Sequence, residues 1–385
     1  MKNPSPVGAV TKGSPARSRT TINARHILVG KELLDHGPGT IIIENGVIAG
    51  IESHLSSSPD YNIDVLMPLP VNTHMHISDY RVPERCIGLR LGEYVGSKGL
   101  KHPYIRLYRV PKASPELEYL FAMLGLIGDY QEIHGDCVFY REWLGKLGVD
   151  YIGLSRPTDW NNVSLEELLG IAGKCGGIGV SNPLKLPRYA VDLLAFVSRR
   201  YVVSAHVSET RRMEERGSLH YLLSSGVLLR HVVHGVYLED WELRLLADHG
   251  IVLVVNPRSN LWFTGRIASV EKLLEYDGLF ALGTDNAGCF HPDVMIEAEY
   301  LYTLKPYLDP KRIVEALTVN GYHAMDVEPP IIEENREAYM LGLDLGLAGR
   351  RTWNIYASIV RRAPWSRRII VFKKDIVYTI DKRLS

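Results

Sequence analysis

Short apolar runs and amphipathic segments alternate along most of the chain. Runs such as Ile178–Val180, Tyr201–Ala205 and Ile251–Val255 are largely apolar, and segments with the spacing of amphipathic helices separate them. Repeated strand–helix units with apolar strands are typical of a parallel sheet that helices cover on both faces. Because about eight such strands fit between Leu66 and Asp285, we predict an α/β fold with a (β/α)8 TIM-like barrel.

Local signals set several boundaries within this barrel. Ser164–Glu167 forms a capping box, which predicts a helix that ends near Gly176 and Gly177. The segment from Pro115 to Tyr130 is predicted as a helix, and Asp136–Tyr140 as a strand.

Two β-rich segments flank the barrel. Between Thr21 and Ser53, the dipeptide Asn45-Gly46 separates two β-branched runs, which predicts a hairpin. Short β runs return between Thr352 and Asp381. Because neither segment is long enough to stand alone, we expect them to pair into one small β-sandwich satellite domain built from both chain ends.

These patterns divide the chain into three parts. Residues 1–20 are rich in Ser, Pro, Gly, Lys and Arg, which predicts a flexible tail. We assign residues 21–65 together with 340–385 to the composite β-sandwich domain, and residues 66–339 to the barrel.

Composition and charge narrow the class of partner. Hydrophobic residues make up 46% of the 385 residues, and Lys+Arg and Asp+Glu are equal at 44 each. A balanced charge gives no overall field that would attract nucleic acid or an anionic membrane. The apolar runs are shorter than the ~18 residues of a membrane helix, and the polar opening segment lacks the apolar core of a signal peptide. We therefore expect a cytoplasmic protein that binds a small-molecule substrate, not nucleic acid or a membrane, and we leave a homo-oligomer open.

The cysteines and amides carry two further signals. The four cysteines, Cys86, Cys137, Cys175 and Cys289, are scattered without a Cys-x-x-Cys motif, so we expect neither a thiolate zinc site nor a disulfide framework. Gln131 is the only glutamine, and poverty in heat-labile amides is typical of thermophiles.

The first candidate chemistry lies at the end of the run Met67–His76. Residues two apart in a strand project to the same face, so His74 and His76 can reach one ion that prefers nitrogen ligands. Taken alone, such a pair is more often structural. Further strand ends carry suitable side chains, namely His206 and Glu209, His234, and Asp285.

The position of these residues favours a shared site. Chemistry in barrel enzymes sits at the carboxyl ends of the strands, where these residues are expected to meet. Each alone has a structural alternative, because Asp285, for example, could cap the next helix. Their joint occurrence is improbable by chance, and we therefore predict a functional metal site.

A basic stretch follows the first ligand strand. It contains few acidic residues and many cations, namely Arg81, Arg85, Arg90, Lys98, Lys101, Arg106 and Arg109. A basic loop at this place could recognise an anionic group of the substrate, with Arg81 as a contact. A solvated surface insertion is the simpler alternative.

Together the motifs resemble the amidohydrolase superfamily, in particular its metal-dependent deaminase and chlorohydrolase branch, which includes adenosine-derivative, guanine and cytosine deaminases. The matching segments are Pro70–His76, His206–Thr210, His234–Leu238, Asn256–Leu261 and Leu282–Asp285. The resemblance extends from Thr21 to the C-terminus.

The resemblance implies a role for each ligand-type residue. His74, His76, His206 and Asp285 would bind one divalent ion, Zn or Fe, and lower the pKa of a water to ~7. Glu209 would act as general acid/base, His234 would hydrogen-bond the attacking oxygen, and Asp285 could also shuttle a proton.

A second metal is not expected. Binuclear relatives carry a carboxylated lysine at the end of the fourth strand, and here that strand ends in Val180-Ser181-Asn182. Lys185 lies three residues further on, so we predict a mononuclear site.

The departures from the family pattern concern the substrate. Val255 and Tyr237 replace histidines that are common in the branch, and Ser181–Lys185 replaces a familiar Ala-Pro-His-Ala-Pro segment. We take the substrate contacts to be Arg81, Tyr237, Asn256 and Arg258, with Asn256 either structural or substrate-orienting.

The predicted reaction is hydrolysis of a C–N bond, with deamination of a purine, pyrimidine or related amino-heterocycle as the leading hypothesis. The same metal could instead hydrolyse a cyclic or linear amide, because both reactions pass through a similar tetrahedral adduct. A non-catalytic barrel scaffold is the remaining alternative, although scaffolds usually lose ligands and this chain keeps the full set.

Overall fold

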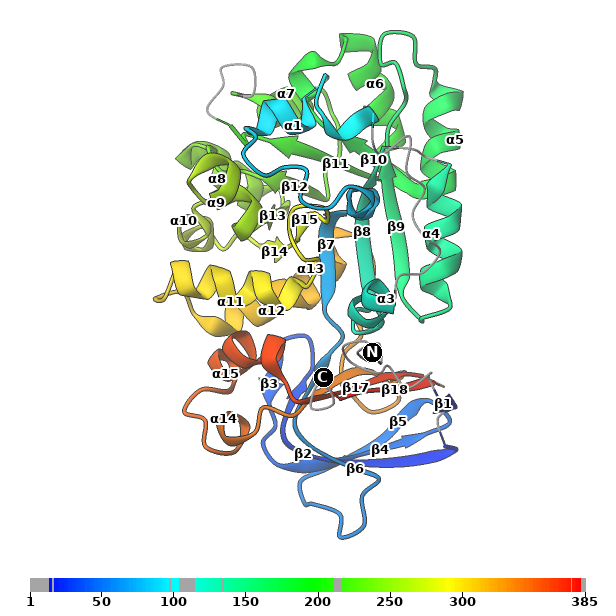
Figure 1. The fold of residues 1–385 in the computed structure, drawn as a ribbon, viewed down its shortest axis with the longest axis vertical. Coiled ribbons are helices and arrows are strands. Elements are labelled where there is room, and N and C mark those ends of the chain that lie inside the picture. Colours follow the sequence, from blue (N-terminus) through cyan, green and yellow to red (C-terminus); the bar gives the residue numbers. More distant parts are fainter. Residues whose placement is uncertain are drawn as a thin grey trace, which may run out of the picture.

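The computed structural model describes residues 14–15, 17–96, 98–103, 115–132, 135–210, 216–374 and 376–381. These residues form two sheets of different kinds, one of parallel strands ringed by helices and one built from both chain ends (Figure 1).

The parallel sheet closes into the expected barrel. Its order is β14-β13-β12-β11-β10-β9-β8-β7-β15, and all neighbours are parallel. The strands are β7 (Val71–His76), β8 (Leu126–Gln131), β9 (Asp150–Ser155), β10 (Gly176–Val180), β11 (Val202–Val207), β12 (His231–His234), β13 (Val252–Val255), β14 (Phe280–Leu282) and β15 (Asp285–Asn286). Only Gly283 and Thr284 separate β14 from β15, so the two ends of this order join and the sheet closes.

Helices cover the outside of the barrel. They are α3 (Pro115–Ala122), α4 (Asp136–Gly145), α5 (Leu165–Cys175), α6 (Arg188–Val197), α7 (Ser218–Ser224), α8 (Asp240–Asp248), α9 (Pro257–Thr264), α10 (Val270–Glu275), α11 (Val294–Leu304), α12 (Pro310–Leu317) and α13 (Val319–Ala324). The capping box is confirmed, because Ser164 Oγ accepts from Glu167 N at 3.1 Å. Gly176, with φ of 118°, ends α5 as predicted.

Two local predictions are wrong. The segment predicted as a helix over 115–130 changes to strand β8 after α3, because the apolar run of α3 continues into β8 and hides the change of period. The predicted strand 136–140 is the start of α4. Its buried residues Cys137, Tyr140 and Leu144 follow helical spacing, although several of its residue types favour strands.

The second sheet combines the two ends of the chain. Its order is β1-β18-β17-β16-β6-β2-β4-β5, with β3 paired to β2. The strands are β1 (Ser14–Pro15), β2 (Arg19–Val29), β3 (Leu34–Asp35), β4 (Gly39–Glu44), β5 (Val47–Glu52), β6 (Tyr61–Pro68), β16 (Tyr339–Leu343), β17 (Arg368–Lys373) and β18 (Ile376–Asp381). The predicted hairpin joins β4 to β5, and Asn45 and Gly46 have the positive φ values, 49° and 78°, that its tight turn requires.

The boundaries drawn from the sequence differ from these elements in places. Within the segment predicted as a flexible tail, Ser14–Pro15 pairs with β18 and β2 begins at Arg19; residues 1–13 and 16 lie outside the described ones. Between β16 and β17 lie the helices α14 (Leu347–Arg350) and α15 (Ile355–Arg362) and the 3-10 turn η4 (Ala363–Trp365), and α15 packs on α11 and α12 of the barrel. The domain division at 65/66 and 339/340 remains a prediction.

The second sheet leads directly into the first ligand strand. β6 ends at Pro68 and β7 begins at Val71, so only Leu69 and Pro70 separate them. Met67 and Leu69, at the join, are buried in the main hydrophobic core. The satellite sheet therefore anchors the base of the strand that carries His74 and His76.

The cysteines form two disulfides, Cys86–Cys289 and Cys137–Cys175. The expectation of no disulfide framework is therefore wrong. The partners are separated by 203 and 38 positions in the sequence, so their spacing gave no sign of pairing, whereas the fold brings their Cα atoms to 6.0 and 5.1 Å.

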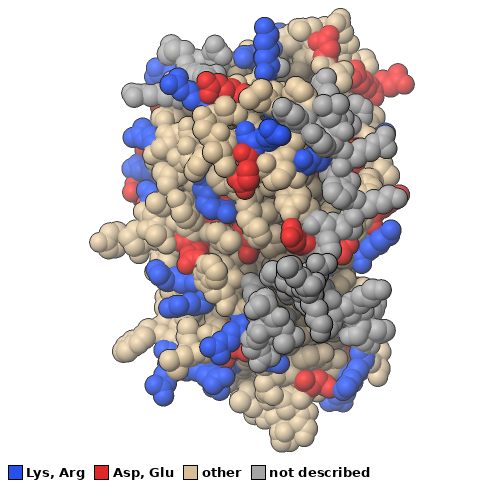
Figure 2. All heavy atoms as spheres, in the orientation of Figure 1, with Lys and Arg blue, Asp and Glu red and all other residues tan. Residues whose placement is uncertain are grey.

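The charged residues are distributed without a dominant sign. Figure 2 shows Lys and Arg side chains interspersed with Asp and Glu on the visible face, in keeping with the balanced composition. Within the described residues, the helices are too short or too polar to cross a membrane.

His231, at the start of β12, offers a test of the barrel packing. It is fully buried, its Nδ1 donates to Ala324 O at 2.8 Å, and burial lowers its pKa to about 4. The unfolded chain gains a proton near pH 6.5. The contribution of the neutral, buried His231 to the free energy of unfolding is therefore complete above this pH and is lost as the pH falls towards 4.

We expect the free energy of unfolding of the wild type to fall by roughly 2–3 kcal/mol more than that of His231→Asn between pH 7 and pH 4. Denaturant titrations at several pH values measure this difference. His249→Asn, at an exposed position, is the control and should keep the wild-type pH dependence. Parallel curves for the wild type and His231→Asn would contradict the prediction.

Candidate metal centre

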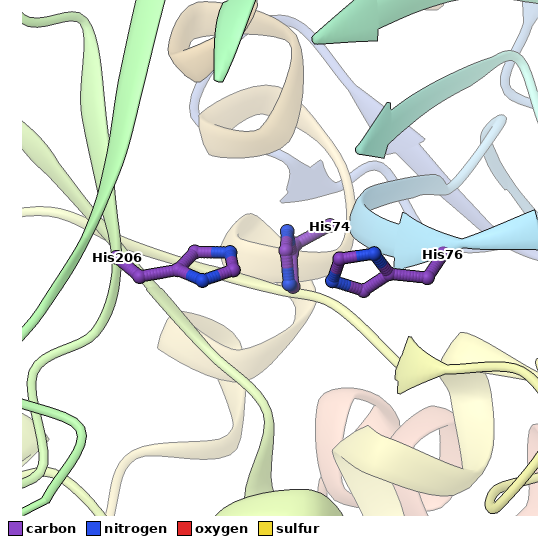
Figure 3. Close-up of side chains that lie close together, drawn as sticks. All are labelled: His74, His76 and His206. Carbon is purple, nitrogen blue, oxygen red and sulfur yellow. The ribbon is translucent and has the colours of Figure 1, made fainter. Parts of the chain in front are cut away.

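Strand β7 places His74 and His76 at the carboxyl end of the barrel. Residues two apart share one face of a strand, and both imidazoles are buried, at 0% and 7% exposure. The end of β11 brings His206 beside them. Figure 3 shows the three rings side by side, with His74 between the other two. Ring centroids lie 5.1 Å apart for His74 and His76, and 5.0 Å for His74 and His206.

Asp285 completes the cluster from the first residue of β15. Its Oδ1 lies 3.3 Å from His74 Nε2 and 3.5 Å from His76 Nε2. Ligands bonded to zinc at ~2.0–2.1 Å in a tetrahedron lie about 3.3 Å apart, so these separations suit ligands of one ion. Ser259 Oγ, from α9, donates to the other carboxylate oxygen.

One orphaned atom points to the same conclusion. Nε2 of His206 is buried and has no hydrogen-bond partner among the described residues, and a ring nitrogen of His206 lies within 4.8 Å of ring nitrogens of His74 and His76. A buried polar atom without a partner is costly, and an ion bound between these side chains would satisfy it. The residues present therefore fit a divalent metal.

Electrostatics keep the cluster in its ligating form. Burial lowers the pKa of His76 well below its usual value, and Lys101 lowers it further. Burial and the neighbouring His234 do the same for His206. Burial alone would raise the pKa of Asp285, but the hydrogen bond with His74 and the nearby imidazoles hold it well below its usual range. Neutral imidazoles and an ionised carboxylate are the forms that bind a metal.

Glu209 and His234 lie next to the ligands. Glu209 follows β11, His234 ends β12, and Oε2 of Glu209 lies 3.7 Å from Nε2 of His234. The amide of Asn260 donates to His234 Nδ1 at 2.9 Å, and Asn256 does so at 3.2 Å. Because Nδ1 accepts, the proton of the neutral imidazole is on Nε2, facing Glu209.

The backbone is strained at this end of the barrel. Ser208, His234 and Asp285 have φ values of 46°, 74° and 59°. These values lie in the left-handed region, which residues other than glycine rarely adopt. Such conformations persist where the surrounding structure imposes them, and they cluster at functional sites. Here they lie at or beside the ends of β11, β12 and β14/β15, where they aim side chains into the centre.

A cavity of about 830 Å³ opens above the cluster. Its lining includes His76, His206, Glu209, His234 and Asp285. This volume is within the range of small-molecule sites.

One wall of the cavity is a chain of ion pairs that the sequence did not reveal. Lys101 Nζ lies 3.2 Å from Asp79 Oδ2 and 3.4 Å from Glu132 Oε1. Arg156 binds the other oxygen of Glu132 and also donates to Ser181 Oγ. Burial opposes ionisation of Glu132, but Lys101 and Arg156 outweigh it and lower its pKa to about 2. The signal in the sequence was positional, because Glu132 and Arg156 each follow a barrel strand directly.

The four predicted substrate contacts lie elsewhere, and none of them lines this cavity. Arg81 pairs with Asp136 at 2.6 Å. Arg258 is held by Glu297, with Nε 2.7 Å from Oε1.

The ring of Tyr237 lies under the guanidinium of Arg266, 5.7 Å from ring centre to Cζ. Asn256 contacts His234 Nδ1 through its side-chain amide. Of the basic stretch, Lys98 and Lys101 line the cavity, whereas Arg106 and Arg109 lie outside the described residues. The substrate contacts predicted from the sequence remain a prediction, and the side chains that line this cavity include side chains of the ion-pair wall instead.

Asp129 in β8 is a further residue that sequence analysis missed, because its segment was predicted as helix. It is fully buried, and its Oδ1 accepts from Ile77 N at 2.9 Å, immediately after His76. Tyr151 donates to its other oxygen at 2.9 Å. Asp129 thereby fixes the backbone where the chain leaves the ligand strand.

Comparisons with known proteins agree with this geometry. The model of the amidohydrolase family matches residues 198–366. A 5-methylthioadenosine/S-adenosylhomocysteine deaminase of Thermococcus sibiricus is 27% identical, with 84% of this chain and 85% of that protein covered. A 5'-deoxyadenosine deaminase of Methanothermobacter thermautotrophicus is 25% identical, with 82% of this chain and 84% of that protein covered.

Solved structures share the fold. An adenosine deaminase from Xanthomonas campestris with bound zinc has a TM-score of 0.71 at 17% identity, with 92% of each chain covered. The atrazine chlorohydrolase of Arthrobacter aurescens TC1 complexed with zinc has a TM-score of 0.73 at 13% identity, with 92% of this chain and 94% of that chain covered. At these identities the likeness concerns the barrel and its satellite sheet.

Ser259 provides a test of the metal centre that leaves all ligands in place. Ser259→Ala removes the donor that orients Asp285, so we expect zinc affinity to fall about 10-fold. Competition with a chromophoric chelator measures this affinity. Ser155→Ala is the matched control, since Ser155 is equally buried and donates to Gln131 O at 3.0 Å, away from Asp285. Equal zinc affinity in the two variants would contradict the role of Ser259.

Proposed function

We propose that this chain is a member of the amidohydrolase superfamily, that it uses one divalent metal ion to hydrolyse a C–N bond, and that it deaminates an amino-substituted heterocycle. The observation that carries the proposal is the convergence of the three imidazoles and Asp285 beside Glu209, on the floor of one cavity.

The ligands of the ion are His74, His76, His206 and Asp285. We propose Zn or Fe, since imidazole and carboxylate suit both. When bound, such an ion supplies a Lewis acid that lowers the pKa of water to ~7. The end of β10 supports a single ion, because Ser181 and Asn182 stand there and Lys185 lies beyond them in the short turn η2 (Pro183–Lys185).

Glu209 moves the protons in this proposal. A carboxylate that lines the cavity next to the ligands can accept a proton from the attacking water and deliver it to a ring nitrogen of the heterocycle. Its neighbour His234 stays neutral at physiological pH, because burial lowers the pKa of His234 to about 4. The Nε2 hydrogen of His234 then donates to the oxygen on which negative charge develops.

The ion-pair wall is the surface that we propose for orienting the substrate. Lys101, Glu132 and Arg156 lie at the ends of neighbouring strands or above them, and Glu209 and His234 lie on the other side of the ligands around the barrel. The ion-pair wall offers hydrogen-bond donors on Lys101 and Arg156 and a carboxylate, Glu132, that stays ionised. The deaminase names of two relatives that are 27% and 25% identical support a purine derivative as the first substrate class to examine.

Replacement of Glu209 tests the proton transfer. We expect Glu209→Gln to keep its metal and lose turnover by roughly 100-fold or more, because the amide cannot accept the proton. Ammonia release from a panel of amino-heterocycles measures turnover, and metal analysis of the same samples confirms loading. Glu142→Gln, on an exposed position of α4, is the control. Wild-type rates in Glu209→Gln would remove Glu209 from the mechanism.

Metal removal tests the role of the ligand cluster. Exhaustive chelation is expected to abolish turnover, and addition of Zn or Fe(II) to restore it, since the ion activates the water. Full turnover in a sample that contains no metal would refute a metal-dependent reaction. A fully loaded protein that releases no ammonia from the panel but hydrolyses cyclic or linear amides would favour the alternative amidase.

A further inference from the structure

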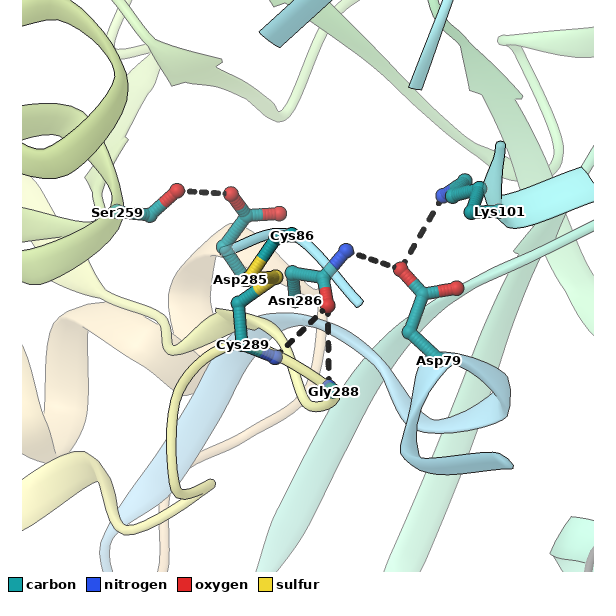
Figure 4. The surroundings of a disulfide bond; sticks show 8 residues. All are labelled: Asp79, Cys86, Lys101, Ser259, Asp285, Asn286, Gly288 and Cys289. Carbon is teal, nitrogen blue, oxygen red and sulfur yellow. Dashed lines mark hydrogen bonds and ion pairs between the residues drawn. A yellow bond between two sulfur atoms is a disulfide. The ribbon is translucent and has the colours of Figure 1, made fainter. Parts of the chain in front are cut away.

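The Cys86–Cys289 disulfide joins the two loops that leave the metal centre. Cys86 lies in the loop that follows the ligand strand β7, and Cys289 lies shortly after the ligand Asp285. Figure 4 shows the disulfide beside Asp285, Asn286 and Asp79. The other disulfide, Cys137–Cys175, instead links α4 to α5 on the outside of the barrel.

Several contacts lock the two loops together around this bond. Asn286, next to Asp285, accepts from Gly288 N at 3.0 Å and Cys289 N at 3.1 Å. Its amide donates to Asp79 Oδ2 in the opposite loop. Glu84 N, two residues before Cys86, donates to Gly288 O at 2.7 Å. A Cβ at position 288 would collide with the Asp79 carbonyl, which shows how closely the loops approach.

These contacts lead to the ion-pair wall. Oδ2 of Asp79 is held by Asn286 on one side and by Lys101 on the other, at 3.2 Å. Lys101 in turn holds Glu132 at 3.4 Å. The disulfide therefore sits at one end of a continuous chain of contacts that runs through Asn286 and Asp79 to the cavity lining.

We propose that the Cys86–Cys289 disulfide is a redox-sensitive positioning element of this centre. Its reduction frees the loop of Asp79 from the loop of Asn286. The protein then retains its metal less strongly and the side chains of the ion-pair wall lose their alignment, while the barrel stays folded. The effect on turnover rests on the proposed function, whereas the effect on metal retention does not.

The redox step needs a dithiol as the reductant. One thiolate of the dithiol attacks a cysteine sulfur, forms a mixed disulfide with it and releases the other cysteine as a thiolate. The second thiolate of the dithiol then attacks the dithiol sulfur of this mixed disulfide and releases the remaining cysteine, so that a cyclic disulfide and two cysteine thiols result. The two disulfides differ in how accessible they are to a dithiol in solution. Cys289 is partly exposed, whereas Cys137 and Cys175 are both fully buried. A mild dithiol treatment of the folded protein is thus expected to open Cys86–Cys289 first.

The experiment treats zinc-loaded protein with a dithiol under native conditions and identifies the opened pair by alkylation and peptide mass spectrometry. Zinc transfer to a chromophoric chelator is measured before reduction, after it and after reoxidation. We expect about 10-fold weaker zinc retention on reduction, as for other loss of support around metal ligands, and recovery on reoxidation. With a substrate in hand, KM should rise more than kcat falls.

Paired variants complete the test. Cys86→Ser/Cys289→Ser should reproduce the reduced state, and Cys137→Ser/Cys175→Ser should retain zinc like the wild type while unfolding at a lower temperature. The proposal is overturned by unchanged zinc retention in a folded Cys86→Ser/Cys289→Ser protein, by equal losses in both paired variants, or by loss of the native circular dichroism on selective reduction. A protein without deaminase activity whose zinc retention still responds to reduction would refute the proposed function alone.

Discussion

The centre depends on one buried carboxylate that two imidazoles share. Asp285 Oδ1 stands 3.3 Å from His74 Nε2 and 3.5 Å from His76 Nε2, and a buried charge is tolerated only where it is paired. The pairing exists because β15 lies against β7 and closes the barrel. The pairing that closes the barrel therefore also brings Asp285 to His74 and His76, and it includes the residue with the left-handed backbone, Asp285 itself.

The sequence allowed the clustered side chains to be grouped because the fold imposes a simple rule on their position. Side chains that follow the strands of a parallel barrel meet at one end, so the sequence alone allowed His74, His76, His206 and Asp285 to be grouped. The rule says nothing about elements away from the strand ends. Helix α4 was missed because its composition favours a strand while its buried spacing is helical.

Long-range pairing explains the remaining differences. Arg258 forms an ion pair with Glu297 of another helix, and Arg81 forms one with Asp136. The local sequence does not distinguish an arginine that forms such an ion pair from one that binds a substrate. The disulfide Cys86–Cys289 is the extreme case, with 203 positions between its ends. Side chains placed by a fixed strand position could thus be grouped from the sequence, whereas contacts with a distant partner could not be predicted from it.

The composite second sheet also orders events during synthesis of the protein. β6, which runs into the ligand strand β7, lies between β2 and β16, and β16 follows the entire barrel in the chain. This second neighbour of β6 is therefore synthesised only after every strand of the barrel. Contacts between the two ends of a chain form late and slowly. The strand that carries His74 and His76 thus has a fully paired base only once β16, from beyond the barrel, has joined β6.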